Sequence, residues 1–266
     1  MNMLIAIPVY NEQDYVDRVL NKVRRYGHDL LVIDDGSTDQ TSLLLARQPV
    51  DVIRHADNRG YGRSIRDAMR WAQCYRYDWL ITMDCDEQHQ PESIPDFCAA
   101  IRADRADVIS GSRYLNGAIS GDAPPSDRQA INAEITTLIT SILGFDITDA
   151  FCGFKAYRVA ALQHLRLDEP GYAFPLQFWV QAAAHELRIE EVPIRLIYND
   201  PNRSFGGQLG DPAQRREHYR AVFDKEIGKF PERFAASCCV KCETAASLSL
   251  CDDPAVPQST AAVTRN

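Results

Sequence analysis

The chain has 266 residues and a formal net charge of −8 at pH 7, and its 45% hydrophobic and 25% charged residues are ordinary values for a globular protein. This length fits one large domain, or a domain with an appendage. The negative charge argues against a nucleic-acid binder, because contacts to phosphates need a basic face. No apolar run reaches the roughly 18–20 residues of a spanning helix, and no secretory signal is visible. We expect a cytoplasmic protein, or one that is peripheral at the inner face of a membrane.

Apolar strand patterns alternate with amphipathic helix patterns through the first hundred residues. In one predicted helix, Ile65, Ala68, Met69, Ala72 and Tyr75 recur at spacings of three and four, which makes one buried stripe. The predicted strands are Met3–Val9, Leu30–Asp34, Val50–Arg54, Trp79–Asp84 and Val108–Gly111, and the predicted helices are Glu12–Tyr26, Thr38–Arg47, Tyr61–Tyr77 and Pro91–Arg102. This alternation implies an α/β fold with a mostly parallel, doubly wound central sheet.

The second half of the chain begins with a polar loop and a strongly apolar amphipathic helix, Arg128–Leu143. This helix either packs in the core or rests at a bilayer interface. The elements predicted after it are a strand at Phe151–Tyr157, a helix at Phe174–His185, a strand at Leu187–Tyr198 and, beyond a polar loop, a helix that ends near Lys229. The residues from Ala235 onward lack periodicity, which predicts a disordered tail. We therefore predict one domain over residues 1–229, with halves 1–114 and 115–229, and a cysteine-containing tail over residues 230–266.

The cysteines form two groups. Those in the globular part are interpreted as small buried thiols, namely Cys74, Cys85, Cys98 and Cys152. A second group, Cys238, Cys239, Cys242 and Cys251, crowds the tail. A zinc knuckle there is the less favoured interpretation, because paired CxxC units and histidines are missing.

The most informative motif is an acidic cluster that follows the apolar segment Trp79–Thr82. Asp84 and Asp86 stand at positions i and i+2 after this strand, so in an extended segment both would point to the same side. Ligands bind at the carboxyl ends of strands in α/β sheets. Two neighbouring carboxylates favour a cation between them, and oxygen ligands suit Mg²⁺ or Mn²⁺ together with a substrate diphosphate. We predict a metal-diphosphate site.

Three further polar loops follow the first three strands. The first contains Pro8, Tyr10 and Glu12, and Tyr10 offers a face on which a base can stack. The second contains Asp34 and Asp35, and an acidic residue that ends a strand can hydrogen-bond a ribose or a base. The third runs from Asn58 to Gly62, where glycines let the backbone approach a ligand. Each motif alone is more often a turn or a cap, but their order on the first four strands argues against chance.

Together these motifs resemble family 2 glycosyltransferases of the GT-A fold, and within them the polyprenyl-phosphate (dolichyl-phosphate) mannosyltransferases. The resemblance covers roughly residues 3–225, and its most specific element is the segment from Asp84 to Glu92, with the sequence DCDEQHQPE. The other matching segments begin at Pro8 (PVYNE), Asp34 (DDGSTD), Asn58 (NRGYG), Gly111 (GSRY), Cys152 (CGFKAYR), Gly171 (GYAF), Glu191 (EVPI) and Asn202 (NRS).

The resemblance implies a role for each group of residues. The nucleoside of a nucleotide sugar would be held by Pro8, Tyr10, Glu12 and Asp35, with Asp34, Asn58 and Gly60 beside them. Mg²⁺ or Mn²⁺ and the donor diphosphate would be bound by Asp84, Asp86 and Gln88. The acceptor phosphate and the diphosphate would be bound by Arg113, Arg128, Arg203 and Ser204. Guanidinium groups suit phosphate oxygens because they form paired hydrogen bonds. The expected substrates are GDP-mannose or UDP-glucose and a polyprenyl phosphate.

The expected reaction transfers a hexose with inversion, and two alternatives stay open. One is a soluble family 2 enzyme that uses a saccharide hydroxyl in cell-surface polysaccharide synthesis. Such an acceptor needs a general base, and Asp149 is the only modest candidate for that base. The other alternative is an inactive protein that binds a nucleotide sugar.

Overall fold

The structure, a computed structural model, describes residues 1–87, 89–115, 126–195, 197 and 210–234. Backbone contacts divide the chain into one unit, Met1–Phe230, and a second, Pro231–Asn266. All the strands and helices named here lie in the first unit. The predicted tail disorder and zinc knuckle fall outside the described residues, as do Gln88, Arg203 and Ser204.

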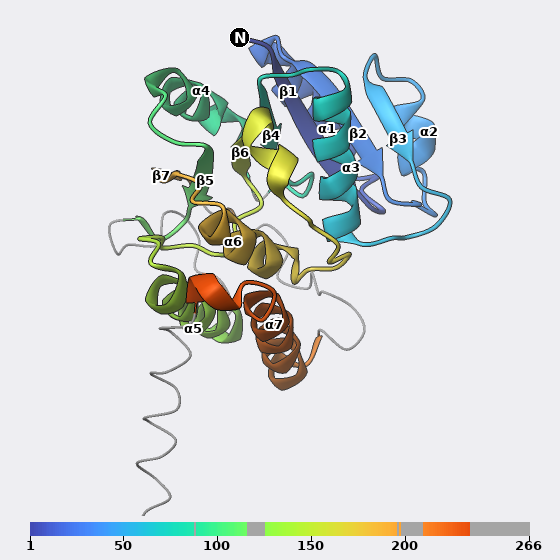
Figure 1. Ribbon diagram of the computed structural model, residues 1–266. Helices are drawn as coiled ribbons and strands as arrows, with labels where there is room; N and C mark the ends of the chain where they lie inside the picture. Colours follow the sequence, from blue (N-terminus) through green and yellow to red (C-terminus); the bar gives the residue numbers. More distant parts are fainter. Residues whose placement is uncertain (88, 116–125, 196, 198–209, 235–266) are drawn as a thin grey trace, which may run out of the picture. The chain divides into compact units, whose positions relative to one another are not determined.

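The described core is an α/β fold around a seven-stranded sheet with the strand order β3-β2-β1-β4-β6-β5-β7 (Figure 1). The strands pair in parallel except for β6, which is antiparallel to both β4 and β5. This confirms the expected α/β class and the mostly parallel sheet. The strands are β1 (Met3–Val9), β2 (Asp29–Asp34), β3 (Asp51–Arg54), β4 (Trp79–Thr82), β5 (Val108–Ser112), β6 (Lys155–Arg158) and β7 (Ile189–Pro193).

Helices cover both faces of the sheet, because the central strands are apolar on both sides. Alternate residues of β1, from Met3 to Val9, join one core cluster with the buried faces of α1 and α4, while α3 also packs against β1. The helices α5, α6 and α7 pack against one another below the sheet in Figure 1. The helices are α1 (Val16–Val23), α2 (Thr41–Leu45), α3 (Tyr61–Cys74), α4 (Ile94–Ala103), α5 (Ser126–Leu143), α6 (Phe174–Ala184) and α7 (Pro212–Ile227), with short 3-10 helices at Arg24–Tyr26, Pro91–Ser93 and Val159–His164.

Some sequence expectations need correction. The stripe on α3 is buried as predicted except for Tyr75, which is 59% exposed because the helix ends one residue earlier. Cys74 is exposed, whereas the other three cysteines of the globular part are buried. Helix α5 buries Ile131, Ile135 and Ile139, so core packing explains its apolar face.

One carboxylate ties together the ends of three strands in the second half. Asp107, just before β5, accepts hydrogen bonds from Nε of Arg158 (3.1 Å) and from Nε and Nη2 of Arg188 (3.0 and 2.9 Å). These bonds, those from Arg188 first, lower the pKa of Asp107 to about 2. Because this pKa is depressed by folding, its stabilising effect is present above the unfolded pKa and is lost as the pH falls through about 2.

We expect Asp107→Asn to lower the free energy of unfolding by about 2 kcal/mol at pH 7, since each unit of pKa shift corresponds to about 1.4 kcal/mol. Urea unfolding at pH 7 and at pH 2.5 measures this difference. The gap between the variant and the wild type should narrow at the lower pH. A gap of the same size at both pH values would contradict the assigned role of the carboxylate.

Candidate active site

The acidic pair follows the central strand β4. The strand ends at Thr82; Asp84 follows two residues later, just before a bend that begins at Cys85 and contains Asp86. The predicted strand Trp79–Asp84 is therefore two residues too long at its end. The Asp84 side chain is 33% exposed and Asp86 is 8% exposed. Both residues nevertheless follow the carboxyl end of a central strand, where the sequence predicted a site.

Gly153 leaves room for the Asp84 carboxylate. The hydroxyl of Thr82 donates to the carbonyl oxygen of Gly153 at 2.9 Å, which holds this glycine beside the end of β4. A Cβ atom at Gly153 would lie 2.7 Å from Oδ2 of Asp84 and 2.9 Å from the hydroxyl of Tyr61. No role for Gly153 or Tyr61 was predicted from the sequence. In the sequence, these two residues were marked only by lying in the CGFKAYR and NRGYG segments, which carry the family resemblance.

His89 lies buried behind the same carboxylate. The main-chain N–H of Asp84 donates to Nδ1 of His89 at 3.1 Å, and this nitrogen also lies 3.6 Å from Oδ2 of Asp84. Burial alone would lower the pKa of His89, but the Asp84 carboxylate and further contacts raise it to about 9. A protonated Nδ1 cannot accept this N–H, so the main-chain hydrogen bond belongs to the neutral form of His89 and the ion pair with Asp84 to the charged form. A charged His89 would offset negative charge in the bend.

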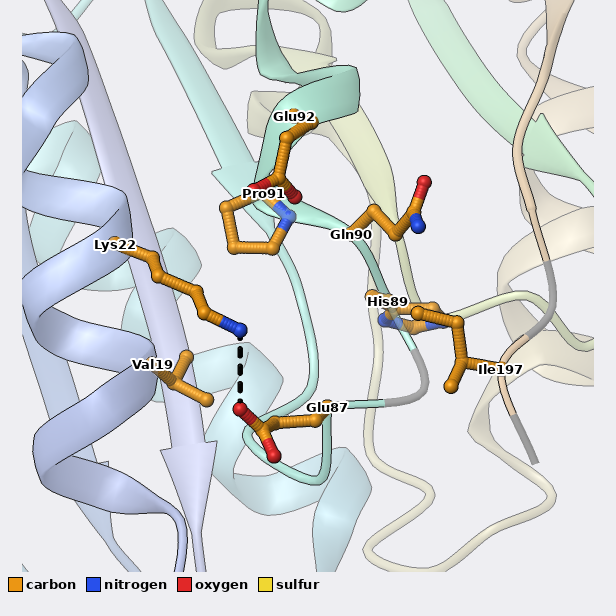
Figure 2. A pocket seen from close by; sticks show the side chains of 8 residues that line it. All are labelled: Val19, Lys22, Glu87, His89, Gln90, Pro91, Glu92 and Ile197. Atoms are coloured by element: carbon orange, nitrogen blue, oxygen red, sulfur yellow. Dashed lines mark hydrogen bonds and ion pairs between the residues drawn. The ribbon is translucent and has the colours of Figure 1, made fainter. Parts of the chain in front are cut away.

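The bend is tied to helix α1 through Glu87. This residue has a left-handed backbone, with φ of 57°, and its carboxylate pairs with Lys22 and Arg18, each at 3.1 Å. Figure 2 shows Lys22 reaching from α1 to Glu87 across a pocket of about 160 Å³. The pocket is lined by Val19, Lys22, Glu87, His89, Gln90, Pro91, Glu92 and Ile197. The ion pairs thus connect α1 to the segment that carries the acidic pair.

The loops after β1 and β2 are joined through Asn11. The side-chain oxygen of Asn11 accepts hydrogen bonds from the main-chain N–H groups of Thr38 (2.8 Å) and Asp39 (3.3 Å). Beside it, Tyr10 is 44% exposed and Glu12 is only 6% exposed. Pro8 is partly buried. Tyr10 is therefore an exposed aromatic residue of this loop on which a planar ligand can stack.

The two aspartates at the end of β2 hold neighbouring backbone. Asp34 is fully buried, and its carboxylate accepts from the N–H of Ser37 (2.9 Å) and from the hydroxyl of Ser42. Asp35, 4% exposed, accepts from the N–H groups of Arg59 and Gly60, each at 2.8 Å. Asp35 thus brings the third predicted loop onto the second. Asn58 lies exposed beside these contacts.

In the second half, Arg113 forms a two-pronged ion pair with Asp149. Nε of Arg113 lies 2.6 Å from Oδ2, Nη2 lies 2.8 Å from Oδ1, and Asn132 of α5 adds a hydrogen bond of 2.9 Å. Burial alone would raise the pKa of Asp149, but Arg113 and Asn132 together hold it below its usual range. Asp149 is 0% exposed. A fully buried and occupied carboxylate does not fit the role of a general base.

Arg128 lies in the first turn of α5, one turn before Asn132. Residues four positions apart share a helix face, so Arg128 lies on the face that contacts Asp149. Burial raises the pKa of Tyr219 on α7 to about 12, although the positive charges of Arg215 and Arg128 act to lower it. The charge of Arg128 therefore acts on Tyr219 of α7, from the helix that also carries Asn132.

The residues after β4 suit a hard divalent cation that is shared with a ligand. Within the described ranges, no group of three or more His, Cys, Asp or Glu side chains could hold a metal ion by itself. Mg²⁺ and Mn²⁺ are commonly held by one or two carboxylates, with phosphates and water completing the shell. Asp84, partly exposed and fitted against Gly153, matches that arrangement. Among the described helices, none combines the length and apolar character needed to cross a bilayer.

Comparison with known proteins assigns the family. Residues 4–166 match the model of glycosyl transferase family 2. An undecaprenyl-phosphate mannosyltransferase of Micrococcus luteus is 33% identical over 79% of this chain and 90% of its own length. A polyprenol monophosphomannose synthase of Mycolicibacterium smegmatis is 30% identical over 72% of this chain and 76% of its own length.

Solved structures agree on the fold. Glucosyl-3-phosphoglycerate synthase of Mycobacterium tuberculosis, in complex with uridine diphosphate, superposes with a TM-score of 0.66 at 14% identity, over 85% of this chain and 80% of that one. The same enzyme with Mn²⁺, uridine diphosphate and phosphoglyceric acid gives a TM-score of 0.62 at 16% identity, over 87% of this chain and 78% of that one. The chain belongs to glycosyl transferase family 2 and is a glycosyltransferase with the GT-A fold.

Proposed function

We propose that this glycosyltransferase moves a hexose, with inversion, from a nucleotide-diphosphate sugar to a polyprenyl phosphate in a metal-dependent reaction. The observation that carries the proposal is the acidic pair after β4, with Asp84 fitted against Gly153. The similarity to an undecaprenyl-phosphate mannosyltransferase over 90% of that protein supports the acceptor class. We further propose that the catalytic domain is residues 1–229 and that it works peripherally at the inner face of a membrane.

The donor would bind along the carboxyl ends of β1, β2 and β4. We assign the nucleoside to Pro8, Tyr10, Glu12, Asp35, Asn58 and Gly60, with the buried Asp34 supporting them through Ser37 and Ser42, and the diphosphate to Asp84, Asp86 and Gln88. Mg²⁺ or Mn²⁺ held by Asp84, Asp86 and Gln88 would neutralise charge that develops on the leaving diphosphate. Tyr10 offers an exposed ring for the base. GDP-mannose and UDP-glucose are the donors to test first.

The acceptor would reach the sugar from the side of Arg113. We assign its phosphate to Arg113, Arg128, Arg203 and Ser204. Asp149 holds two nitrogens of Arg113, so this arginine would contact a phosphate through its remaining nitrogen, in a fixed orientation. A phosphate monoester has a second pKa of about 6 and is already nucleophilic at neutral pH. The buried state of Asp149 disfavours a saccharide hydroxyl, because that acceptor needs a base.

A donor and acceptor screen tests the proposal. Purified protein with MnCl₂ or MgCl₂ is incubated with GDP-mannose, UDP-glucose or UDP-N-acetylglucosamine and a short polyprenyl phosphate or an oligosaccharide. Release of GDP or UDP and the product mass are measured. We expect metal-dependent release with one donor and a glycosylated lipid phosphate as product. Transfer to the oligosaccharide alone, or release that persists in EDTA, would refute the proposal.

Gly153→Ala tests the fit around Asp84. The new Cβ would lie 2.7 Å from Oδ2 of Asp84, so the carboxylate must move. Since a misplacement of about 1 Å can cost about a hundredfold in rate, we expect kcat/KM to fall by about that factor. The metal concentration needed for half-maximal activity should rise. Gly228→Ala, where a Cβ meets only ordinary contacts at 3.5 Å, serves as the control. Equal activity of the two variants would contradict the assigned fit.

A further inference from the structure

His55 connects the proposed nucleoside site to helix α3. It follows β3 directly, and its side chain is 9% exposed. Nδ1 lies 2.6 Å from Oδ1 of Asp35, and Nε2 lies 3.0 Å from Oδ2 of Asp67. Both ring nitrogens of His55 therefore face carboxylates on different elements, and the imidazole forms a bridge between them.

Asp35 is the partner of His55 that shapes the loop. The carboxylate of Asp35 holds the main-chain N–H groups of Arg59 and Gly60, each at 2.8 Å. Gly60 has φ of 95°, and a Cβ there would lie 2.4 Å from the carbonyl oxygen of Pro170. The loop is thus confined between Asp35 and the segment around Pro170. A rotation of the Asp35 carboxylate would release two backbone hydrogen bonds at once.

The far side of the bridge is a charged cluster on α3. Asp67 accepts a hydrogen bond from Nε of Arg63 at 2.7 Å, and Nη1 of Arg70 lies 3.6 Å from its Oδ1. The side chain of Asp67 is 12% exposed. Hydrogen bonds that involve charged partners are shorter and stronger than neutral ones. Asp67 therefore links the far nitrogen of His55 to helix α3, while the contact that fixes Asp35 is made by Nδ1.

We propose that His55 is a positioning residue for the donor: by fixing the Asp35 carboxylate, it holds the main chain of residues 59 and 60 in the shape that receives the nucleoside. This inference rests on the proposed function, since it assumes that the nucleoside lies beside Asp35. His55 does not need to touch the reacting atoms. Its loss should weaken donor binding and leave the rate at saturating donor almost unchanged.

Two substitutions separate the halves of the bridge. His55→Asn places an amide N–H₂ where Nδ1 of His55 stood, so it keeps a donor toward Asp35. His55→Gln places the amide N–H₂ where Nε2 stood, so it keeps a donor toward Asp67 and loses the one toward Asp35. We expect His55→Gln to weaken the binding of GDP or UDP with MnCl₂ about tenfold, a change of about 1.4 kcal/mol. His55→Asn should stay close to the wild type. Isothermal titration calorimetry measures the binding, and steady-state kinetics should show a raised donor KM with an unchanged kcat.

The controls distinguish this inference from the proposed function. His164→Gln, at an exposed residue of the 3-10 helix Val159–His164, should behave as the wild type, and thermal melts confirm that each variant is folded. If the wild type binds neither GDP nor UDP, the proposed function fails. If the wild type binds and His55→Gln binds equally well, or if both His55 variants lose affinity equally, the bridge does not position the donor and this inference is overturned.

Discussion

Replacing Asp84 by asparagine is expected to lower kcat/KM for the nucleotide sugar by about a thousandfold in a protein that stays folded. The side chain is 33% exposed and asparagine keeps its size, while the buried His89 loses the carboxylate that raises its pKa and can become neutral. The activity should respond because a neutral amide is a poorer ligand for Mg²⁺ or Mn²⁺, and removing one group that stabilises transition-state charge costs about 10²–10³ in rate. Release of GDP or UDP at saturating MnCl₂ measures the loss.

A matched control is available on α4. Asp96 is exposed in the first turn of that helix, outside the acidic bend. Asp96→Asn removes the same charge and should keep the activity of the wild type. Equal activity of the two variants, with both folded, would remove Asp84 from the catalytic machinery.

Asp149→Asn is expected to destabilise the fold by about 3 kcal/mol, because removing one partner of a buried ion pair leaves the other uncompensated. The substitution would weaken both contacts to Arg113 and the one to Asn132. Arg113 would also lose its fixed orientation, so activity should fall in the fraction of the protein that stays folded. Urea unfolding at pH 7, with activity measured on the folded variant, separates the two effects.

The pKa of Asp149 also predicts how the stability of the protein changes with pH. The pKa of Asp149 is depressed in the folded protein, so its contribution is present above the usual value of 3.8 and is lost as the pH falls below that value. The wild type should therefore lose stability on acidification, and Asp149→Asn should lose less of it. A variant as stable as the wild type at pH 7 would show that this cluster does not support the fold.

Helices and strands with a strong hydrophobic periodicity could be predicted from the sequence. The central strand β1 was predicted with its observed bounds, and α3 differs only at its end. Helix α2 is shorter than predicted, Thr41–Leu45 rather than Thr38–Arg47, because the preceding residues are held by Asn11 across the chain. The antiparallel direction of β6 was not predicted. The direction of β6 depends on its pairing with β4, more than seventy residues away in the sequence. The four residues of β6 alone do not indicate which strand they pair with or in which direction.

The candidate site was predictable as a set of loops but not as a set of contacts. The rule that ligands bind at the carboxyl ends of strands brought the acidic pair and the three polar loops together. It could not show that Asp35 holds the backbone of Arg59 and Gly60, or that Arg113 pairs with Asp149. The residues in these contacts lie 24 to 36 positions apart in the sequence, and their spacing follows no regular period. Contacts of this kind arise only from the folded packing.

Binding of Mn²⁺ in the presence of GDP or UDP tests the central claim most directly. The wild type and an Asp84→Asn, Asp86→Asn double variant are titrated with Mn²⁺ at a fixed nucleotide concentration, and bound Mn²⁺ is measured by electron paramagnetic resonance. We expect one Mn²⁺ per wild-type chain, bound only with nucleotide, and at least tenfold weaker binding to the double variant. Equal, nucleotide-dependent binding by both proteins would mean that the cation is held elsewhere and would contradict this account.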